Sequence, residues 1–296
     1  MKITIHEKFM NFAQKPLEDL GHTVSTNDLN ADMVVGYPSQ LEKLKDFKNL
    51  KYVQLFSAGY DGLDLSYLKE NNIKLFNARG VYSGAIAEYI LTHVLGVYNQ
   101  VHVYKDLQRK REWHKEMIHP RILGKRVLYL GTGSIGSETA KRFKALGTFN
   151  VGFNSNGRSL EYFDETYPLS ELKDHLPTAD IIVASLPDND YTRHLIGKEA
   201  VKLMKKGSIF VNVGRGTLVD EVGIKDDIDH LSALILDVFE TEPLPEDSYL
   251  WDRDNVIVTP HIAANSDQNE AYLLELLLKN LDSIKNKKPY HNLIEL

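Results

Sequence analysis

With 296 residues, 43% of them hydrophobic and 26% charged, the chain is long enough for about two globular domains with sizeable cores. Its formal net charge of −6 argues against nucleic acid and anionic membranes as main partners, and no apolar run approaches the ~18 residues of a membrane-spanning helix. The absence of cysteine excludes disulfides and thiolate chemistry and fits a cytoplasmic protein, and the first ten residues lack the apolar core of a signal peptide.

Short apolar segments alternate with helical patterns through the first part of the chain. Strands are expected at residues 2–6, 33–36, 52–56 and 73–76, and short helices at residues 16–20 and 65–68. This alternation favours a parallel, layered α/β unit.

The next segment, from Ile86 to Tyr104, is apolar nearly all round a helix, as expected for a helix that is buried on most sides. It would serve as a bridge between domains or as a subunit interface, and periodicity alone leaves a plain core helix open as well. The polar and basic segment 108–124 is expected to be a surface connection. Its Arg109-Lys110-Arg111 run is more typical of a solvated helix end than of a nucleic-acid site.

A glycine-rich stretch follows a short apolar run, Val127 to Leu130, and precedes a helical pattern. Gly131 can adopt the backbone angles of a tight turn, Gly133 leaves room for a pyrophosphate, and Gly136 lets the helix lie close to the strand. The N–H groups at the helix start can then bind the anion, so the stretch predicts a dinucleotide site, with an ordinary glycine turn as the alternative. The expected contacts are Gly131, Gly133, Ser134, Ile135 and Gly136.

The remaining strands and the last helix complete the predicted fold. Strands are expected at residues 127–130, 150–154, 181–186, 209–213, 234–238 and 256–259. Six strands with this glycine turn indicate a doubly wound dinucleotide domain, and the helix at 266–285 is expected to pack back on the first domain. The prediction is an α/β protein with two Rossmann-like, parallel-sheet domains. Residues 1–98 plus 266–296 would form a discontinuous substrate-binding domain, and residues 99–265 would form the NAD(P)-binding domain.

The end of the second strand of the dinucleotide domain bears on the choice of cofactor. NAD-binding domains carry an acidic residue there, about 20 residues beyond the glycines, to bind the ribose hydroxyls. Here the position is Asn154, followed by Ser155, Asn156 and Arg158. A carboxylate would repel a 2′-phosphate, whereas these side chains can donate hydrogen bonds to one. The sequence therefore favours NADP over NAD, although Asn154 could also bind the ribose of NAD.

Three polar residues follow three different strands: Arg215, Glu242 and His261. Because ligands of open α/β sheets bind beyond the carboxyl ends of the strands, all three could face one crevice. Arginine offers a fork for a carboxylate, histidine exchanges a proton near neutral pH, and a nearby glutamate favours the imidazolium form. From the residues alone, a catalytic triad and three structural side chains both remain open.

Five segments together resemble the D-isomer-specific 2-hydroxyacid dehydrogenases over almost the whole chain. They are Gly124–Gly136, Leu186-Pro187 with Tyr191–Ile196, Val213–Asp220, Asp237–Pro243 and Thr259–Ala263. The resemblance implies that Arg215 is the family's catalytic arginine, that Glu242 is the family's acidic residue and that His261 is its acid/base histidine. It also implies that the Ser57-Ala58-Gly59 loop and Arg215 hold the substrate carboxylate, and that His261 contacts the substrate as well. Further cofactor contacts are implied at Leu186, Pro187, Val213, Gly214 and Asp237, of which Asp237 would bind the nicotinamide carboxamide.

The resemblance implies hydride transfer between NAD(P)H and a small 2-oxo acid or D-2-hydroxy acid. Ala87-Glu88 resembles the start of the family's interdomain helix, which implies a homodimer through residues 84–104. Two alternatives are a non-catalytic, NAD(P)-sensing binding protein on the same scaffold and another two-domain oxidoreductase with the same glycine turn. No metal site is expected, because the histidines show no HExxH spacing. Tyr60, Tyr82 and Trp251 could line the substrate side-chain end, which leaves glyoxylate, hydroxypyruvate, pyruvate and bulkier acids open.

Overall fold

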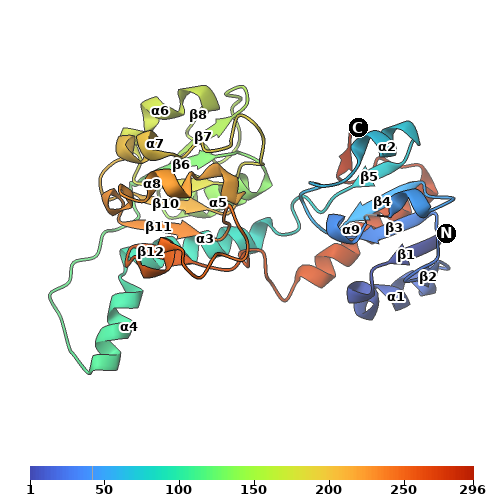
Figure 1. Ribbon diagram of the computed structural model, residues 1–296, viewed down its shortest axis with the longest axis horizontal. Helices are drawn as coiled ribbons and strands as arrows, with labels where there is room; N and C mark the ends of the chain where they lie inside the picture. The colour runs from blue at the N-terminus through green and yellow to red at the C-terminus, as the bar shows by residue number, and fades with distance from the viewer. Residues whose placement is uncertain (42) are drawn as a thin grey trace. The chain divides into compact units, whose positions relative to one another are not determined.

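The computed structural model describes residues 1–41 and 43–296. The chain forms two compact units, one of Met1–Tyr82 with Ser266–Leu296 and the other of Ser83–Asn265. Each is an α/β unit built on its own mainly parallel sheet (Figure 1). The predicted fold is therefore confirmed, including the discontinuous first unit.

The first unit has a six-stranded sheet in the order β13-β5-β4-β3-β1-β2, parallel except for β13. Its strands are β1 (Lys2–Ile5), β2 (Thr23–Ser25), β3 (Met33–Gly36), β4 (Tyr52–Leu55), β5 (Lys74–Phe76) and β13 (Leu293–Ile294). Its α-helices are α1 (Met10–Asp19), α2 (Leu65–Glu70) and α9 (Asn269–Asn286). Short 3-10 turns lie at Glu7–Phe9, Pro38–Gln40 and Leu44–Asp46.

Helix α9 belongs to the first unit because both apolar and polar contacts attach it there. Leu277 and Leu281 lie in the core beside α1 and the sheet. Asn280, fully buried, donates from Nδ2 to Oε1 of the equally buried Gln54 at 2.8 Å and accepts from the backbone N–H of His291 at 2.9 Å. A buried amide costs free energy unless it is hydrogen-bonded, so this pairing fixes where the last helix packs.

The second unit has a seven-stranded, fully parallel sheet in the order β12-β11-β10-β9-β6-β7-β8. Its strands are β6 (Arg126–Leu130), β7 (Phe149–Asn154), β8 (Glu165–Pro168), β9 (Ile181–Ala184), β10 (Ile209–Asn212), β11 (Ala233–Leu236) and β12 (Val256–Val258). Its α-helices are α3 (Ser83–Tyr98), α4 (Val101–Lys110), α5 (Ser134–Ala145), α6 (Leu172–His175), α7 (Lys198–Leu203) and α8 (Glu221–Ile224). Its 3-10 turns are Leu169–Glu171, Leu176–Thr178, Gly216–Leu218, Ile228–His230 and Tyr249–Asp252.

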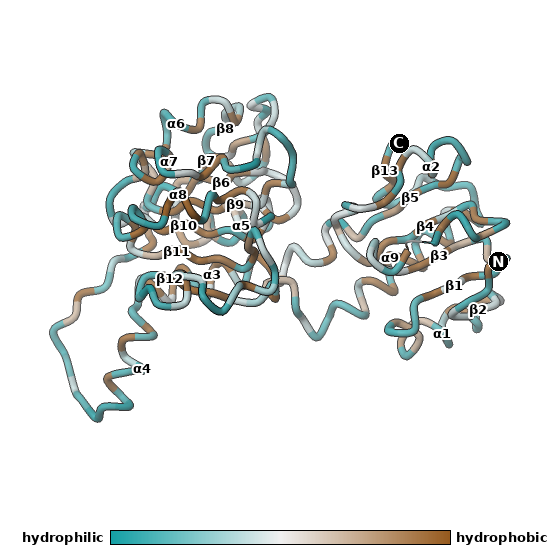
Figure 2. The backbone as a smooth tube through the Cα atoms, viewed as in Figure 1, coloured by the Kyte–Doolittle hydropathy of each residue, from teal (hydrophilic) through white to brown (hydrophobic). Residues whose placement is uncertain are grey.

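The hydrophobic strands of both units form their cores, as the brown segments of Figure 2 show. Sheet order reverses between β6 and β9, which makes the second unit doubly wound. All six expected strands of this unit are present, but the expected number is wrong because β8 adds a seventh. Its sequence, Glu-Thr-Tyr-Pro, lies half-buried at the sheet edge and lacks an apolar run.

The single helix expected from Ile86 to Tyr104 is two helices, α3 and α4. The chain breaks between them at Gln100, whose φ of +50° lies in the left-handed region. Helix α3 packs against α5 and buries Ile86, Ile90 and Val94, whereas α4 buries no residue and extends away from the sheet (Figure 1). Because α3 packs within the second unit, the units divide at Tyr82 rather than at the expected residue 98.

None of the helices in the described ranges 1–41 and 43–296 combines the length and the hydrophobicity needed to cross a membrane.

Candidate active site

The candidate catalytic residues follow three neighbouring strands. In the parallel sheet, Asn212 at the end of β10 pairs with Leu236 of β11, and Leu236 pairs with Val258 of β12. The segments that carry Arg215, Glu242 and His261 therefore leave the sheet at the same edge. That edge is where parallel α/β sheets bind their ligands.

The Glu242 and His261 side chains are directly hydrogen-bonded. Glu242 Oε2 lies 2.8 Å from His261 Nδ1, and the other carboxylate oxygen accepts from the backbone N–H of Phe239 at 3.1 Å. Both side chains remain partly exposed, His261 by 55% and Glu242 by 38%. Because the carboxylate can only accept, it holds the proton of the imidazole on Nδ1 and leaves Nε2 as the atom that exchanges a proton.

The loop of Arg215 lies against the segment that leads to Glu242. A Cβ on Gly216 would lie 1.9 Å from the carbonyl carbon of Phe239, so only glycine permits this approach. Asn212 holds the loop from inside, since its side chain donates to the carbonyl of Arg215 at 2.9 Å. The guanidinium of Arg215 donates from Nη1 to the carbonyl of Gly214 at 2.9 Å. The arginine loop and the glutamate segment are thus brought together by the backbone.

The loop of His261 is fixed by Asp237, which is 2% exposed. Its carboxylate accepts hydrogen bonds from the backbone N–H groups of Ile262 and Ala263, both at 2.9 Å, and from the Thr259 hydroxyl at 2.6 Å. The sequence indicated Asp237 only as a cofactor contact, by resemblance. The sequence signal for this structural role was the position of Asp237 directly after a buried strand.

The glycine turn has the geometry that a dinucleotide requires. Gly131 has a φ of +101°, and a Cβ on Gly136 would lie 2.1 Å from the carbonyl oxygen of Gly131. By contrast, a Cβ on Gly133 would meet no atom within 4 Å. Gly133 is the N-cap of α5, whose first turn contains Ser134 and Ile135. Open space at the N-terminus of a long helix, next to a residue without a side chain, fits a pyrophosphate.

Asn154 shapes the loop that follows β7. Its Nδ2 donates to the carbonyl of Arg158 at 3.0 Å, and its Oδ1 accepts from the backbone N–H groups of Asn156 and Arg158 at 3.2 and 3.1 Å. Asn154 is nearly buried, whereas Ser155, Asn156 and Arg158 are exposed. The amide of Asn154 thus closes the loop. Its position, where NAD-binding domains carry an acidic residue, did not suggest this role. The exposed hydrogen-bond donors lie on the residues after it.

The other expected cofactor contacts lie where β9 and β10 end. A Cβ on Gly214 would lie 2.7 Å from the carbonyl oxygen of Leu186, so the two loops are in close contact. Val213 donates its backbone N–H to Ala184 at 3.0 Å, and the carbonyl of Pro187 accepts from Thr192 Oγ1 at 2.7 Å. These two loops lie at the edge that also carries the glycine turn after β6.

The expected carboxylate-binding loop, Ser57–Gly59, belongs to the first unit. Its three carbonyl oxygens accept hydrogen bonds within that unit. Ala78 N–H donates to Ser57 O at 2.8 Å, Asn77 Nδ2 to Ala58 O at 2.6 Å, and Ser57 Oγ to Gly59 O at 2.6 Å. The carbonyls are therefore engaged on the protein side of the loop.

A cavity of about 410 Å³ adjoins the Glu242–His261 pair. Its other walls are apolar or aromatic: Phe239, Pro243, Leu244, Trp251, Val258 and Pro260. Of the three aromatic residues expected near the substrate side chain, Trp251 lines this cavity. Tyr82 donates its hydroxyl to the carbonyl of Phe56 within the first unit, and Tyr60 is exposed there. Within the described part of the chain, no three His, Asp or Glu side chains cluster as metal ligands would.

Comparison with known proteins agrees with this architecture. The family model described as D-isomer specific 2-hydroxyacid dehydrogenase, NAD binding domain, matches residues 91–263. The glyoxylate reductase of Aeropyrum pernix is 30% identical, over 93% of this chain and 82% of that protein. A family protein from Aeromonas salmonicida has a solved structure with a TM-score of 0.87 and 28% identity, covering 99% and 98% of the two chains.

A second solved structure is the D-isomer specific 2-hydroxyacid dehydrogenase of Xanthobacter autotrophicus Py2 in complex with NADPH and MES. It has a TM-score of 0.84 and 25% identity, covering 99% of this chain and 98% of that one. The family model covers more than half of the chain, and the Aeropyrum relative aligns over nearly all of it. The chain is therefore an NAD(P)-dependent oxidoreductase that belongs to the D-isomer specific 2-hydroxyacid dehydrogenase family.

Proposed function

We propose that this enzyme reduces a small 2-oxo acid to the D-2-hydroxy acid, with NADPH favoured over NADH as the reductant. The observation that carries the proposal is the hydrogen-bonded Glu242–His261 pair, which shares its sheet edge with the Arg215 loop and the glycine turn. A proton donor, a carboxylate-binding cation and a dinucleotide turn are the groups that this reduction requires.

His261 delivers the proton in this proposal. Glu242 occupies Nδ1 at 2.8 Å, which fixes the ring and directs Nε2 toward the substrate oxygen. When bound, the reduced nicotinamide supplies the hydride that the carbonyl carbon accepts.

Arg215 binds the carboxylate of the substrate, because a guanidinium pairs with a carboxylate through two parallel hydrogen bonds. The same side chain can polarise the keto oxygen. The Ser57–Gly59 loop would bind the carboxylate through its backbone N–H groups, since its carbonyls are engaged within the first unit. The unit of residues 1–82 with 266–296 would then be the substrate-binding domain, and the unit of residues 83–265 would be the cofactor domain.

The glycine turn and the N-terminus of α5 would hold the pyrophosphate, with Leu186, Pro187, Val213 and Gly214 along the rest of the cofactor. The NADPH preference is supported by the exposed Ser155 and Arg158 on the loop that Asn154 closes. A cationic and a hydroxyl donor suit a 2′-phosphate, and no carboxylate is present at Asn154 to repel it. The Xanthobacter relative was crystallised with NADPH, which agrees with this preference.

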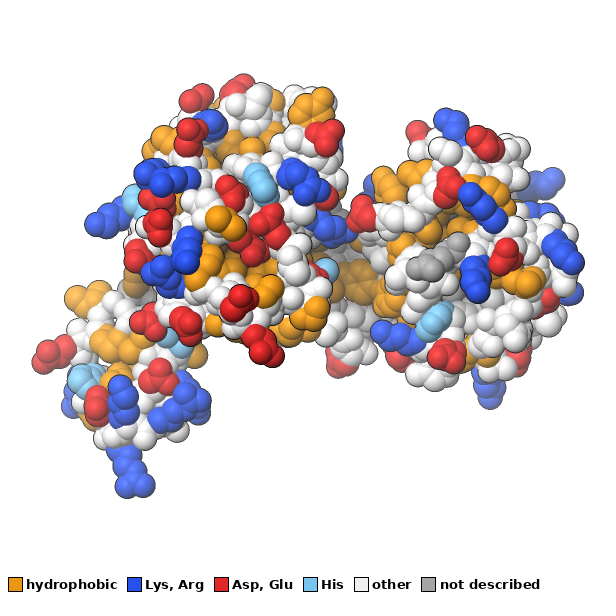
Figure 3. Space-filling model, viewed as in Figure 1, with side chains coloured by type: hydrophobic (Ala, Val, Ile, Leu, Met, Phe, Trp, Pro, Cys, Tyr) orange, Lys and Arg blue, Asp and Glu red, His pale blue; other side chains and the backbone are white. Residues whose placement is uncertain are grey.

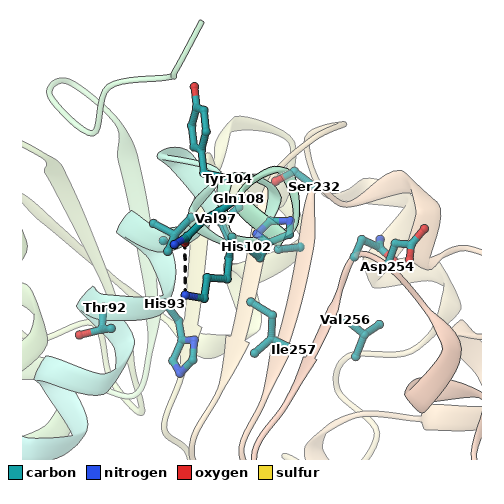
Figure 4. A pocket seen from close by; sticks show the side chains of 15 residues that line it. Thr92, His93, Val97, His102, Tyr104, Gln108, Ser232, Asp254, Val256 and Ile257 are labelled. Atoms are coloured by element: carbon teal, nitrogen blue, oxygen red, sulfur yellow. Dashed lines mark hydrogen bonds between the residues drawn. The ribbon is translucent and has the colours of Figure 1, made fainter. Parts of the chain in front are cut away.

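We further propose a homodimer through residues 84–104. The arm formed by α4 buries none of its residues, and Val101 is 58% exposed. Figure 3 shows hydrophobic atoms between charged side chains on this arm. Beside it lies a groove of about 820 Å³, lined by Val97, Val101, Tyr104, Val256 and Ile257 among others (Figure 4). Burial of such a surface is favourable, and a second copy presents the complementary apolar residues.

The discriminating experiment is turnover with glyoxylate, hydroxypyruvate, pyruvate and bulkier 2-oxo acids, each with NADPH and NADH. Oxidation of NADPH with at least one acid, lost in His261→Ala, is the expected result. The competing function is a non-catalytic NAD(P)-sensing protein on the same scaffold. It would bind the dinucleotide with no turnover of any acid, and that outcome would overturn the proposal.

A further inference from the structure

The backbone of His261 is in a conformation that few side chains adopt. Its φ is +54°, in the left-handed region, which costs a non-glycine residue roughly 1 kcal/mol or more. Its N–H donates to the carbonyls of Asp237 and Thr259, at 2.9 and 3.0 Å. Such a conformation persists only where the surrounding structure holds it.

Asp237 holds the two residues that follow His261. Its Oδ1 accepts from the N–H of Ile262 and its Oδ2 from the N–H of Ala263, both at 2.9 Å. Asp237 is 2% exposed and lies directly after β11, so it is a buried anchor for the loop. Charge-assisted hydrogen bonds in a buried site are stronger than those between neutral groups.

A second set of contacts holds Asp237 itself. The Thr259 hydroxyl donates to Asp237 Oδ1 at 2.6 Å. The hydroxyl of Tyr89 lies 2.6 Å from Thr259 Oγ1. Since the single proton of Thr259 goes to the carboxylate, Tyr89 must be the donor in that pair. The direction of the chain is therefore fixed, from Tyr89 to Thr259 to Asp237.

Tyr89 is well suited to this part. Burial raises its pKa to about 12, so its hydroxyl keeps its proton throughout the physiological range. It projects from α3, the helix that packs against α5. Its ring contacts that of His93, with 4.3 Å between the ring centroids, which restricts its rotation. The hydrogen-bonded chain thus connects a packed helix with the loop of the acid/base histidine.

We propose that Tyr89 and Thr259 are positioning residues, which act through Asp237 to hold the His261 loop in its left-handed conformation. The inference rests on the proposed function for its kinetic consequence, because His261 is the proton donor there. Its structural consequence is independent of that function. Loss of the hydrogen bonds from Tyr89 to Thr259 to Asp237 should loosen the segment from Thr259 to Ala263 and misplace Nε2 of His261.

Three variants test the proposal. Tyr89→Phe removes one hydroxyl and keeps the ring against His93, Thr259→Val removes the middle link, and Thr259→Ser keeps it. The matched control is Tyr249→Phe, because burial also raises the pKa of Tyr249 to about 12 and its hydroxyl donates to the carbonyl of Glu221 at 2.7 Å. Each variant is compared with the wild type by hydrogen exchange of the segment 259–263, by kcat, and by NADPH affinity from fluorescence titration.

The expected result is exchange at least tenfold faster in Tyr89→Phe and Thr259→Val, with kcat lowered about tenfold, since a misplaced catalytic group slows proton transfer. NADPH affinity should stay within about twofold, and Thr259→Ser should restore both readouts. A protein that only lost stability would not separate kcat from cofactor affinity in this way. Wild-type exchange and kcat in both Tyr89→Phe and Thr259→Val would overturn the proposal, as would equal effects in Tyr249→Phe. If the wild type turns over no acid, the proposed function fails. The exchange data would still show whether the hydrogen bonds from Tyr89 to Thr259 to Asp237 hold the His261 loop.

Discussion

Glu242 Oε2 lies 2.8 Å from Nδ1 of His261, although the two residues leave the sheet after different strands. The contact uses one nitrogen of the ring and leaves the other for chemistry. It also explains why the segments after β11 and β12 must be held rigidly. Either side chain alone would be an ordinary exposed polar residue at the end of a strand.

Replacing His261 with Ala should lower kcat by about 100-fold or more, which is the usual contribution of a general acid. Glu242→Gln keeps the shape of the side chain but removes the charge, and should lower kcat about tenfold. Steady-state kinetics with the best 2-oxo acid measure both. NADPH binding by fluorescence serves as the control and should be unchanged. Near-normal turnover of His261→Ala would remove this residue from the mechanism.

Replacing either of two glycines of the glycine-rich stretch with Ala should have different effects. Gly136→Ala places a Cβ 2.1 Å from the carbonyl oxygen of Gly131, so it should destabilise the fold by about 1–3 kcal/mol. Gly133→Ala meets no atom within 4 Å, so its melting temperature should change little. The added methyl group lies where a pyrophosphate would approach, and NADPH affinity should fall about tenfold or more. Thermal unfolding and cofactor titration separate the two effects, and normal NADPH affinity in Gly133→Ala would argue against this pyrophosphate site.

The predictions from sequence were most accurate at positions where the structure admits few residue types. The glycine turn and the buried strands of the second unit followed from spacing and hydrophobicity, because close backbone approach and burial restrict those positions strongly. Edge strand β8 was missed because its side chains are half-buried and polar. The break at Gln100 was missed because no glycine or proline marks it.

The side-chain chemistry of the site was only partly predictable. Motif residues could be placed at strand ends, but their partners depend on distances between segments far apart in the chain. The neutral side chain of Asn154 predicts only a preference for NADP, whereas in the structure its amide closes the loop after β7. The link from Tyr89 to Thr259 joins residues 170 positions apart and had no sequence signal beyond a helical stripe. Local patterns cannot supply such contacts, because tertiary packing creates them.

Cofactor preference should respond to the loop after β7. Arg158→Gln removes a cation and should weaken NADPH binding about tenfold, as expected for loss of a charge-assisted hydrogen bond, and leave NADH binding nearly unchanged. Asn154→Asp introduces the carboxylate of NAD-binding domains and should shift the ratio of kcat/KM values toward NADH. NADH in parallel assays is the internal control for folding. An unchanged NADPH to NADH ratio in both variants would contradict the NADP assignment.

The proposed dimer depends on apolar surface around α4. Val101→Glu should shift the protein toward monomer in sedimentation experiments, because a charge would be buried against the second copy. Leu20→Glu is a matched control, since Leu20 and Val101 are each 58% exposed and Leu20 lies in the other unit. The control should retain the wild-type sedimentation coefficient. A wild-type protein that sediments as a monomer would disprove the dimer.

The pH dependence of stability should include a contribution from Asp180, at the start of β9. Burial alone would raise its pKa, but hydrogen bonds from Lys205 Nζ at 2.8 Å and Arg126 N–H at 2.9 Å, with Lys125 nearby, lower the pKa below its usual value. A lowered pKa stabilises the folded state above the unfolded value of about 3.9, and this stability is lost as pH falls through the folded value.

Asp180→Asn should therefore lower the free energy of unfolding by about 1 kcal/mol at pH 7, measured in urea, with a difference from wild type that stays constant down to about pH 5. The difference should shrink below about pH 4, where the wild-type carboxylate also takes up a proton. Asp229→Asn is the control, because Asp229 is 75% exposed and its pair with Arg253 spans 3.7 Å. Exposed pairs of this kind contribute little, so its unfolding should match the wild type at every pH. A pH-independent loss in Asp180→Asn would show that packing, rather than charge, gives Asp180 its role.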